Sequence, residues 1–191
     1  MPVEIEAKMK VEDLSAVRER LKAAGAEPAG SAVETNTFFD TEDRALLAGD
    51  RGLRTREARR ADGTVKATMT YKGPRNHGKL KNRDEFEVMI GDATAAGAML
   101  NALGYVTVLS FQKRRETWRL QGCLVELDEL PHLGRFVEVE GPREDVVMAV
   151  RDQLGLGERP IVKASYIAML VQHLQETSSP TRVVKFPNDE R

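Results

Sequence analysis

The stretch that decides the fold lies at the N-terminus and reads Val3-Glu4-Ile5-Glu6-Ala7-Lys8-Met9. Apolar or small residues alternate in it with two carboxylates and an ammonium group. An alternation of period two is typical of a β-strand with two unlike faces. A half-exposed strand shows the same pattern, so this segment alone does not separate a solvated face from a binding site. We expect a strand over residues 2–10 with one ionic face.

Ionic side chains at a spacing of two recur along the chain and are sorted by sign. They are Arg54 with Arg56, Arg83 with Glu85 and Glu87, Lys113 with Arg115, Glu126 with Asp128, and Glu138 with Glu140. A solvated face does not require such sorting. A site that holds an anion together with metal cations does require it, so the recurrence favours a binding site over a solvated surface.

The composition indicates one globular domain. The chain has 191 residues, with 29 Lys and Arg against 30 Asp and Glu. This near-neutral balance argues against a nucleic-acid partner bound by bulk electrostatics. We expect a single domain over residues 1–176. Residues 177–191 contain two prolines and many polar groups and are expected to form a flexible C-terminal tail.

The cellular compartment is predicted from what the sequence lacks. Cys123 is the single cysteine, so no intrachain disulfide can form and nothing indicates an oxidising environment. No apolar run approaches the ~18 residues of a membrane span, and the first residues do not resemble a signal peptide. The prediction is a cytoplasmic protein without a membrane partner.

Turn signals and apolar periodicity divide the chain into strands and helices. Eight strands are expected at 2–10, 33–39, 52–60, 65–72, 80–90, 105–120, 122–129 and 134–141. Helices are expected at 12–25, 41–48, 92–103, 143–154 and 163–176. Short hairpin links imply antiparallel pairing, and eight such strands usually close on themselves. The predicted fold class is α+β: an eight-stranded antiparallel β-barrel with helices packed outside.

The apolar stripes of the helices decide where the charges point. If the helices cover the outside of the sheet, the ionic face must line the lumen, where buried charges need opposite charges, metal or ligand. Arginine and lysine suit phosphate oxygens, and carboxylates hold Mg²⁺ or Mn²⁺, which bridge phosphate oxygens. The pattern therefore predicts a metal-dependent polyphosphate site.

The segment from Glu4 to Lys8 resembles the ExExK signature of the CYTH superfamily, the triphosphate tunnel metalloenzymes. The resemblance covers about residues 2–175. Supporting segments are Leu53 to Arg56, Thr70 to Pro74, Lys81 to Glu87, Lys113 to Arg115, Glu126 to Asp128 and Leu133 to Glu140. The spacing and the Tyr-Lys-Gly-Pro segment are most similar to the class IV adenylyl cyclase branch, which also contains thiamine-triphosphatase-like and inorganic triphosphatase proteins.

The resemblance implies an eight-stranded tunnel and assigns roles to residues of this chain. The residues implied to bind triphosphate are Lys8, Arg54, Arg56, Lys72, Arg83, Lys113 and Arg115. The residues implied to bind Mg²⁺ or Mn²⁺ are Glu4, Glu6, Glu126, Asp128, Glu138 and Glu140. Among all of these, the catalytic candidates are Lys8, Lys72, Arg115 and Asp128. One departure is that cyclase-like members often carry an Asp and a Tyr where this chain has Asn36 and Phe38.

Three functions are consistent with these residues. The first is a class IV adenylyl cyclase-like lyase that binds ATP and converts it to cyclic AMP and pyrophosphate. The second is a hydrolase of inorganic triphosphate or thiamine triphosphate in the same tunnel. The third, a catalytically silent nucleotide- or polyphosphate-binding module, predicts missing metal carboxylates, and they are all present in the sequence. The pattern leaves the choice between cyclase and hydrolase open, and the similar proteins suggest a homodimer.

Overall fold

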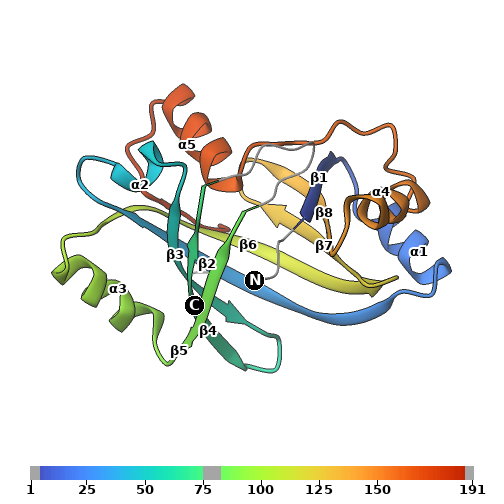
Figure 1. Cartoon of the computed structure of the whole chain (residues 1–191), viewed down its shortest axis with the longest axis horizontal. Helices are drawn as coiled ribbons and strands as arrows, with labels where there is room; N and C mark the ends of the chain where they lie inside the picture. Colours follow the sequence, from blue (N-terminus) through green and yellow to red (C-terminus); the bar gives the residue numbers. More distant parts are fainter. Residues whose placement is uncertain (1–4, 75–82, 188–191) are drawn as a thin grey trace.

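The computed structural model describes residues 5–74 and 83–187. One large sheet carries helices at its two ends and over one side (Figure 1). Its strands are β1 (Ile5–Val11), β2 (Glu27–Asp40), β3 (Gly52–Arg59), β4 (Val65–Lys72), β5 (Glu85–Ile90), β6 (Val106–Leu120), β7 (Cys123–Leu130), β8 (Gly134–Gly141) and β9 (Val183–Val184). The helices are α1 (Ser15–Ala23), α2 (Ala45–Ala48), α3 (Ala93–Ala102), α4 (Glu144–Gln153) and α5 (Tyr166–Glu176).

The strand order is β1-β8-β7-β6-β2-β3-β4-β5, and all of these neighbours pair antiparallel. This confirms the α+β class. In the described ranges the ladder does not join β1 to β5, so the sheet is curved and open. One reason lies at the outer edge of β1, where Met9 bridges Ile161 and the Val162 N–H donates to the Lys8 carbonyl oxygen at 2.7 Å. That edge is already occupied.

The two longest strands, β2 and β6, cross most of the molecule and pair along nearly their whole length (Figure 1). Their register places Glu34 opposite Lys113 and Asn36 opposite Phe111. Directly opposite residues point to the same face, so the charges that alternate along each strand converge on one side. We call this side, which also carries Lys8 and Arg115, the inner face.

The outer face is apolar and is covered by α1 and α4 at one end of the sheet (Figure 1). Leu21 of α1 and Val150 of α4 are fully buried there against the side chains of Val125, Val137 and Val139. Each fully buried aliphatic side chain contributes roughly 1.5–3 kcal/mol. These two helices therefore pack outside, as expected, and drive the charged residues to the opposite face.

Helix α5 differs from expectation because it packs on the inner face. Its buried Tyr166 and Leu170 join a cluster with Leu109, Phe111 and Phe136. Those three strand residues lie on the inner face at one end of the sheet, where the ionic pattern gives way to apolar side chains that must be covered. Helix α5 therefore closes one end of the charged face instead of adding to the outer layer.

The C-terminal segment is packed where the sequence suggests a flexible tail. Strand β9 pairs parallel with β6, and Val184 and Phe186 are buried. The Phe186 N–H donates to Gln112 Oε1 at 3.0 Å, and the Arg114 guanidinium lies 3.9 Å from the Phe186 ring centroid. Residues 183–186 pack against β6 because two apolar side chains in this polar segment are buried there.

Helices long and apolar enough to cross a membrane do not occur in residues 5–74 and 83–187.

Candidate functional site

The inner face buries charges that sequence reasoning places in a lumen. Lys8, Lys113 and Asp128 are 2%, 3% and 0% exposed. Charges so far from water are costly unless opposite charges or a ligand compensate them. The strands β1, β6, β7 and β8 provide this compensation within the protein, as ion pairs among the predicted site residues.

Arg115 is the central cation of the part of the site that is formed by β1, β6, β7 and β8. Its Nε donates to Asp128 Oδ1 at 2.7 Å, its Nη2 lies 2.6 Å from Glu138 Oε2, and its Nη1 pairs with Glu126. Burial alone would lower the pKa of Arg115, but the charges of Asp128 and then Glu126 hold it well above its ordinary value. The guanidinium therefore stays charged and fixes three carboxylates from two strands.

Lys8 is the second cation of this part of the site. Its Nζ lies 3.0 Å from Glu138 Oε1 and 3.6 Å from Glu6 Oε1. It also donates to the Ala164 carbonyl oxygen at 3.3 Å and stands 4.0 Å from the centroid of the Tyr166 ring. Lys8 is thus held on several sides, and its neighbours Glu6 and Glu138 come from paired strands.

Tyr166 is a site residue that sequence reasoning missed. Its hydroxyl donates to Asp128 Oδ2 at 3.0 Å, beside the Lys113 Nζ, which lies 3.3 Å from the same oxygen. Burial, followed by the charges of Glu138 and Asp128, raises the pKa of Tyr166 well above its ordinary value, so the phenol remains a donor. The available signal was Ser165, a helix N-cap residue that marks Tyr166 as the first residue of α5.

Strands β2 and β3 bring a second group of charges to the same face. Glu34 Oε2 lies 3.2 Å from Arg56 Nε and 3.4 Å from Lys113 Nζ. Burial alone would raise the pKa of Glu34, but Lys113 and then Arg56 hold it well below its ordinary range. Sequence reasoning missed Glu34 as well, although it alternates with Asn36 in a segment predicted to be extended.

Arg54 and Lys72 meet at Glu85, at the β5 side of the sheet. Arg54 Nη2 lies 3.7 Å from Glu85 Oε1, and Lys72 Nζ lies 2.5 Å from Glu85 Oε2. Burial, reinforced by the neighbouring charge of Arg56, lowers the pKa of Arg54 to about 10. Two guanidinium groups of like charge therefore share this part of the face at an electrostatic cost.

The predicted metal ligands are near one another but are engaged by cations. Glu6 pairs in register with Glu140, next to the Lys8–Glu138 pair. Oxygen ligands of this kind suit Mg²⁺ or Mn²⁺. Among the described residues, however, carboxylates are not gathered into a group of three that could already hold a metal ion. Glu4 lies outside the described residues. Arg83 is half-buried just before β5.

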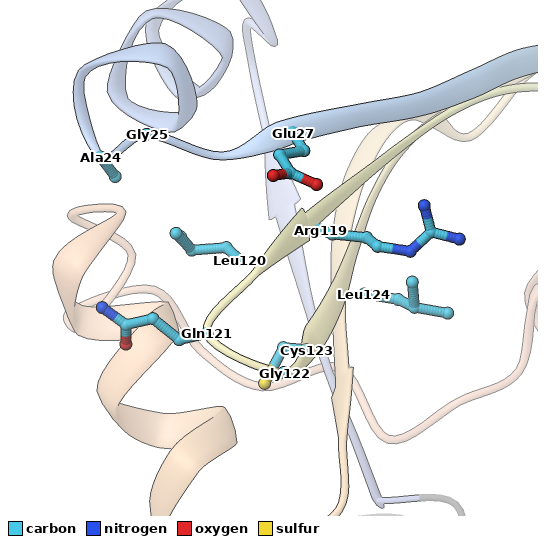
Figure 2. A pocket seen from close by; sticks show the side chains of 9 residues that line it. All are labelled: Ala24, Gly25, Glu27, Arg119, Leu120, Gln121, Gly122, Cys123 and Leu124. Atoms are coloured by element: carbon cyan, nitrogen blue, oxygen red, sulfur yellow. The ribbon is translucent and has the colours of Figure 1, made fainter.

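One cavity opens onto the inner face, and another lies at the β6–β7 hairpin. A cavity of about 140 Å³ is bounded by small residues and reaches Glu34 and Arg115. A larger one of about 430 Å³ lies at the β6–β7 hairpin, where Arg119 and Leu124 point away from Leu120 and Gln121 (Figure 2). Its lining contains only one acidic and one basic side chain. The smaller cavity, and not the larger one, leads to the buried charges.

Glu126 gives a pH-dependent prediction for the metal-free protein. Burial, opposed by Arg115 and reinforced by Asp128, raises the pKa of Glu126 from 4.5 to about 7. Between these values the unfolded chain releases a proton that the folded protein keeps, so this carboxyl makes stability fall as pH rises. Glu126→Gln should therefore be more stable than wild type at pH 8 by about 1–3 kcal/mol, with little difference at pH 4.5.

Urea unfolding in EDTA at the two pH values measures this difference. Glu129→Gln is the matched control, because Glu129 lies on the same strand, is one-third exposed, and pairs with surface arginines. Its difference from wild type should stay nearly constant with pH. A stability advantage of Glu126→Gln that shrinks between pH 4.5 and pH 8 would contradict the raised pKa of Glu126.

Comparison with known proteins agrees with the fold. The CYTH domain family model matches residues 2–154. The chain therefore belongs to the CYTH domain family. Two relatives are each 28% identical to this chain. MJ0240 of Methanocaldococcus jannaschii, named as a candidate adenylate cyclase, matches over 87% of this chain and 98% of its own length. Adenylate cyclase CyaB of Aeromonas hydrophila matches over 90% of each chain.

Solved structures show the same architecture. The PH1819 protein of Pyrococcus horikoshii superposes with a TM-score of 0.77 at 27% identity, over 89% of this chain and 99% of that one. HpAC1 of Hippeastrum, described as a candidate adenylyl cyclase with a dominant triphosphatase activity, superposes with a TM-score of 0.69 at 20% identity, over 91% and 96% of the two chains. At that identity the second likeness concerns the fold alone.

Proposed function

We propose that this protein is a metal-dependent enzyme that acts on a triphosphate at the inner face. The observation that carries the proposal is the pair Arg54 and Arg56, two half-buried guanidinium groups that are two residues apart on one strand and point to one side. Burial and the charge of Arg56 already lower the pKa of Arg54 to about 10. A polyphosphate anion between these groups would relieve both costs.

The two groups of cations on the inner face, one on β3 and β4 and the other on β1 and β6, have different roles in this proposal. Arg54, Arg56 and Lys72 bind and orient the phosphate chain, while Lys8, Lys113 and Arg115 neutralise charge that develops on the reacting phosphoryl group. Asp128, held by Arg115 and Tyr166, keeps these cations in place.

The carboxylates of β1 and β8 are the proposed ligands of Mg²⁺ or Mn²⁺. Glu6, Glu138 and Glu140 supply hard oxygen donors on adjacent strands. A bound divalent cation supplies charge neutralisation at phosphate oxygens. To accept it, Glu138 must give up part of its pairing with Lys8 or Arg115. Residues Glu126 and Asp128 lie next to this set and complete the acidic side of the site.

Two reactions suit such a site. In an adenylyl cyclase, the 3′-hydroxyl of ATP attacks the α-phosphorus and pyrophosphate leaves; in a triphosphatase, water attacks a terminal phosphorus. The names of the Methanocaldococcus and Aeromonas relatives favour the cyclase, and we propose it first. The second candidate is hydrolysis of inorganic or thiamine triphosphate; a dominant triphosphatase activity is described for the Hippeastrum protein, which shares this fold.

Direct titration with inorganic triphosphate in EDTA tests whether the inner face binds the anion. We expect wild-type protein to bind it with a stoichiometry of one and Arg56→Ala to bind at least about tenfold more weakly, because a hydrogen bond between charged groups is lost. Arg59→Ala is the control, since Arg59 lies on the same strand but is 63% exposed and pairs with Glu57. Equal affinities in wild type and Arg56→Ala would contradict the proposal.

A further inference from the structure

Three buried donor atoms on the inner face have no hydrogen-bond partner within the described part of the chain. They are Asn36 Nδ2, Thr68 Oγ1 and Arg54 Nε. A buried donor left unpaired costs roughly 1–3 kcal/mol, and most such groups in folded proteins are satisfied. Three of them on neighbouring strands therefore indicate a place where a ligand supplies the missing acceptor.

The orientation of the Asn36 amide is fixed by its neighbour. Arg56 Nε donates to Asn36 Oδ1 at 3.0 Å. Because an arginine can only donate, the oxygen of the amide must face it, and the Nδ2 group must point elsewhere. Asn36 is 1% exposed, so water does not reach this donor freely. The Nδ2 group is thus a fixed donor in a closed environment.

The unpaired donors surround Arg56. In the strand register Arg56 stands directly between Asn36 of β2 and Thr68 of β4. Directly opposite side chains on one face have Cβ atoms roughly 4.5–5.5 Å apart. Arg54 precedes Arg56 by two residues on the same face. Arg56 itself already faces Glu34 Oε2 at 3.2 Å, but the donors on either side of it lack acceptors. An anion with several oxygens, placed beside Arg56, would supply them.

We propose that Asn36 and Thr68 are substrate-binding residues whose Nδ2 and Oγ1 groups donate to oxygens of a phosphoryl group held by Arg56. This assignment rests on the proposed function, since it deepens the description of the same site. A tetrahedral phosphoryl group offers acceptors in several directions, which donors from three adjacent strands can meet together. A purely structural asparagine at this position would need only its Oδ1 contact with Arg56.

Two variants with different chemistry test the assignment by titration with inorganic triphosphate in EDTA. Asn36→Asp keeps an oxygen toward Arg56 but replaces the donor with an anionic acceptor, and we expect affinity to fall by about 100-fold. Thr68→Val removes the hydroxyl without adding charge, and we expect a loss of about tenfold. Both variants should keep wild-type circular dichroism and unfold cooperatively.

Asn101→Asp is the matched control, because it makes the same chemical change at an exposed position on α3. It should bind triphosphate like wild type. Wild-type affinity in either Asn36→Asp or Thr68→Val, while Arg56→Ala still binds weakly, overturns this assignment and leaves the proposed function standing. Wild-type affinity in Arg56→Ala overturns the proposed function and this assignment with it.

Discussion

Glu138→Gln is expected to lower metal-dependent turnover of a triphosphate by about 10²–10³-fold while the protein stays folded. Glu138 Oε1 lies 3.0 Å from Lys8 Nζ and Oε2 lies 2.6 Å from Arg115 Nη2. Glutamine has nearly the same shape, and its carbonyl oxygen can still accept from one of these cations. It lacks the negative charge that the proposed divalent cation requires. The loss should therefore appear in turnover and metal affinity, not in folding.

Steady-state rates at several Mg²⁺ and Mn²⁺ concentrations, with thermal unfolding of the same samples, measure this effect. Glu129→Gln serves as the control, because Glu129 lies on β7 among surface arginines. It should keep turnover within about twofold of wild type, since surface substitutions away from a site change little. Glu138→Gln protein that turns over like the control would show that the carboxylates of β8 do not take part in the chemistry.

Arg115→Met is expected to destabilise the protein by about 3–5 kcal/mol. Arg115 is the shared partner of Glu126, Asp128 and Glu138. Its removal leaves three buried carboxylates without their main cation. Methionine fills much of the arginine stem volume, so the loss reflects uncompensated charge more than a cavity. The same carboxylates should then take up protons more readily, and the defect should shrink toward pH 5.

Urea unfolding at pH 8 and pH 5 measures the defect of Arg115→Met. Arg119→Met is the control because Arg119 lies four residues further along the same strand but is exposed. Its effect should stay within about 0.5 kcal/mol at both pH values. If the two variants lose equal stability, Arg115 and its ion pairs contribute no more to the free energy of unfolding than a surface arginine does.

The sheet and most of the charged site could be predicted because both depend on local patterns. Alternation of period two identifies strands and also states which residues share a face. Register then places Lys8 next to Glu138 and Arg115 next to Asp128. The hairpin whose turn residues Gln121 and Gly122 both have positive φ follows from the short link between the strands expected at 105–120 and 122–129.

Features that depend on distant partners could not be predicted in this way. The apolar stripe of α5 could cover either the inner or the outer face of the sheet. The apolar patch around Leu109 and Phe136 determines that α5 packs on the inner face. Strand β2 begins at Glu27, not near residue 33, because β6 is long enough to pair with it past a register shift at Pro28 and Gly30. Neither partner is visible from the local sequence.

Glu34 and Asn36 show the same limit within the site. Glu34 has no second carboxylate two residues away, so the sequence pattern does not mark it as a site residue. Its role is visible only in the structure, where Lys113 and Arg56 approach it from the neighbouring strands. The unpaired amide of Asn36 is a property of its contact with Arg56. A sequence pattern identifies the face of a strand, whereas the partners of each atom follow from the packing of several strands.

Product analysis by ³¹P NMR shows whether this protein turns over a triphosphate with a divalent metal. Purified protein would receive ATP, inorganic triphosphate and thiamine triphosphate in parallel, each with Mg²⁺, with Mn²⁺ or with EDTA. We expect metal-dependent turnover of at least one of them: cyclic AMP and pyrophosphate from ATP for a cyclase, or orthophosphate for a triphosphatase. No turnover of any of the three with either metal, or turnover that persists unchanged in EDTA, would contradict this expectation.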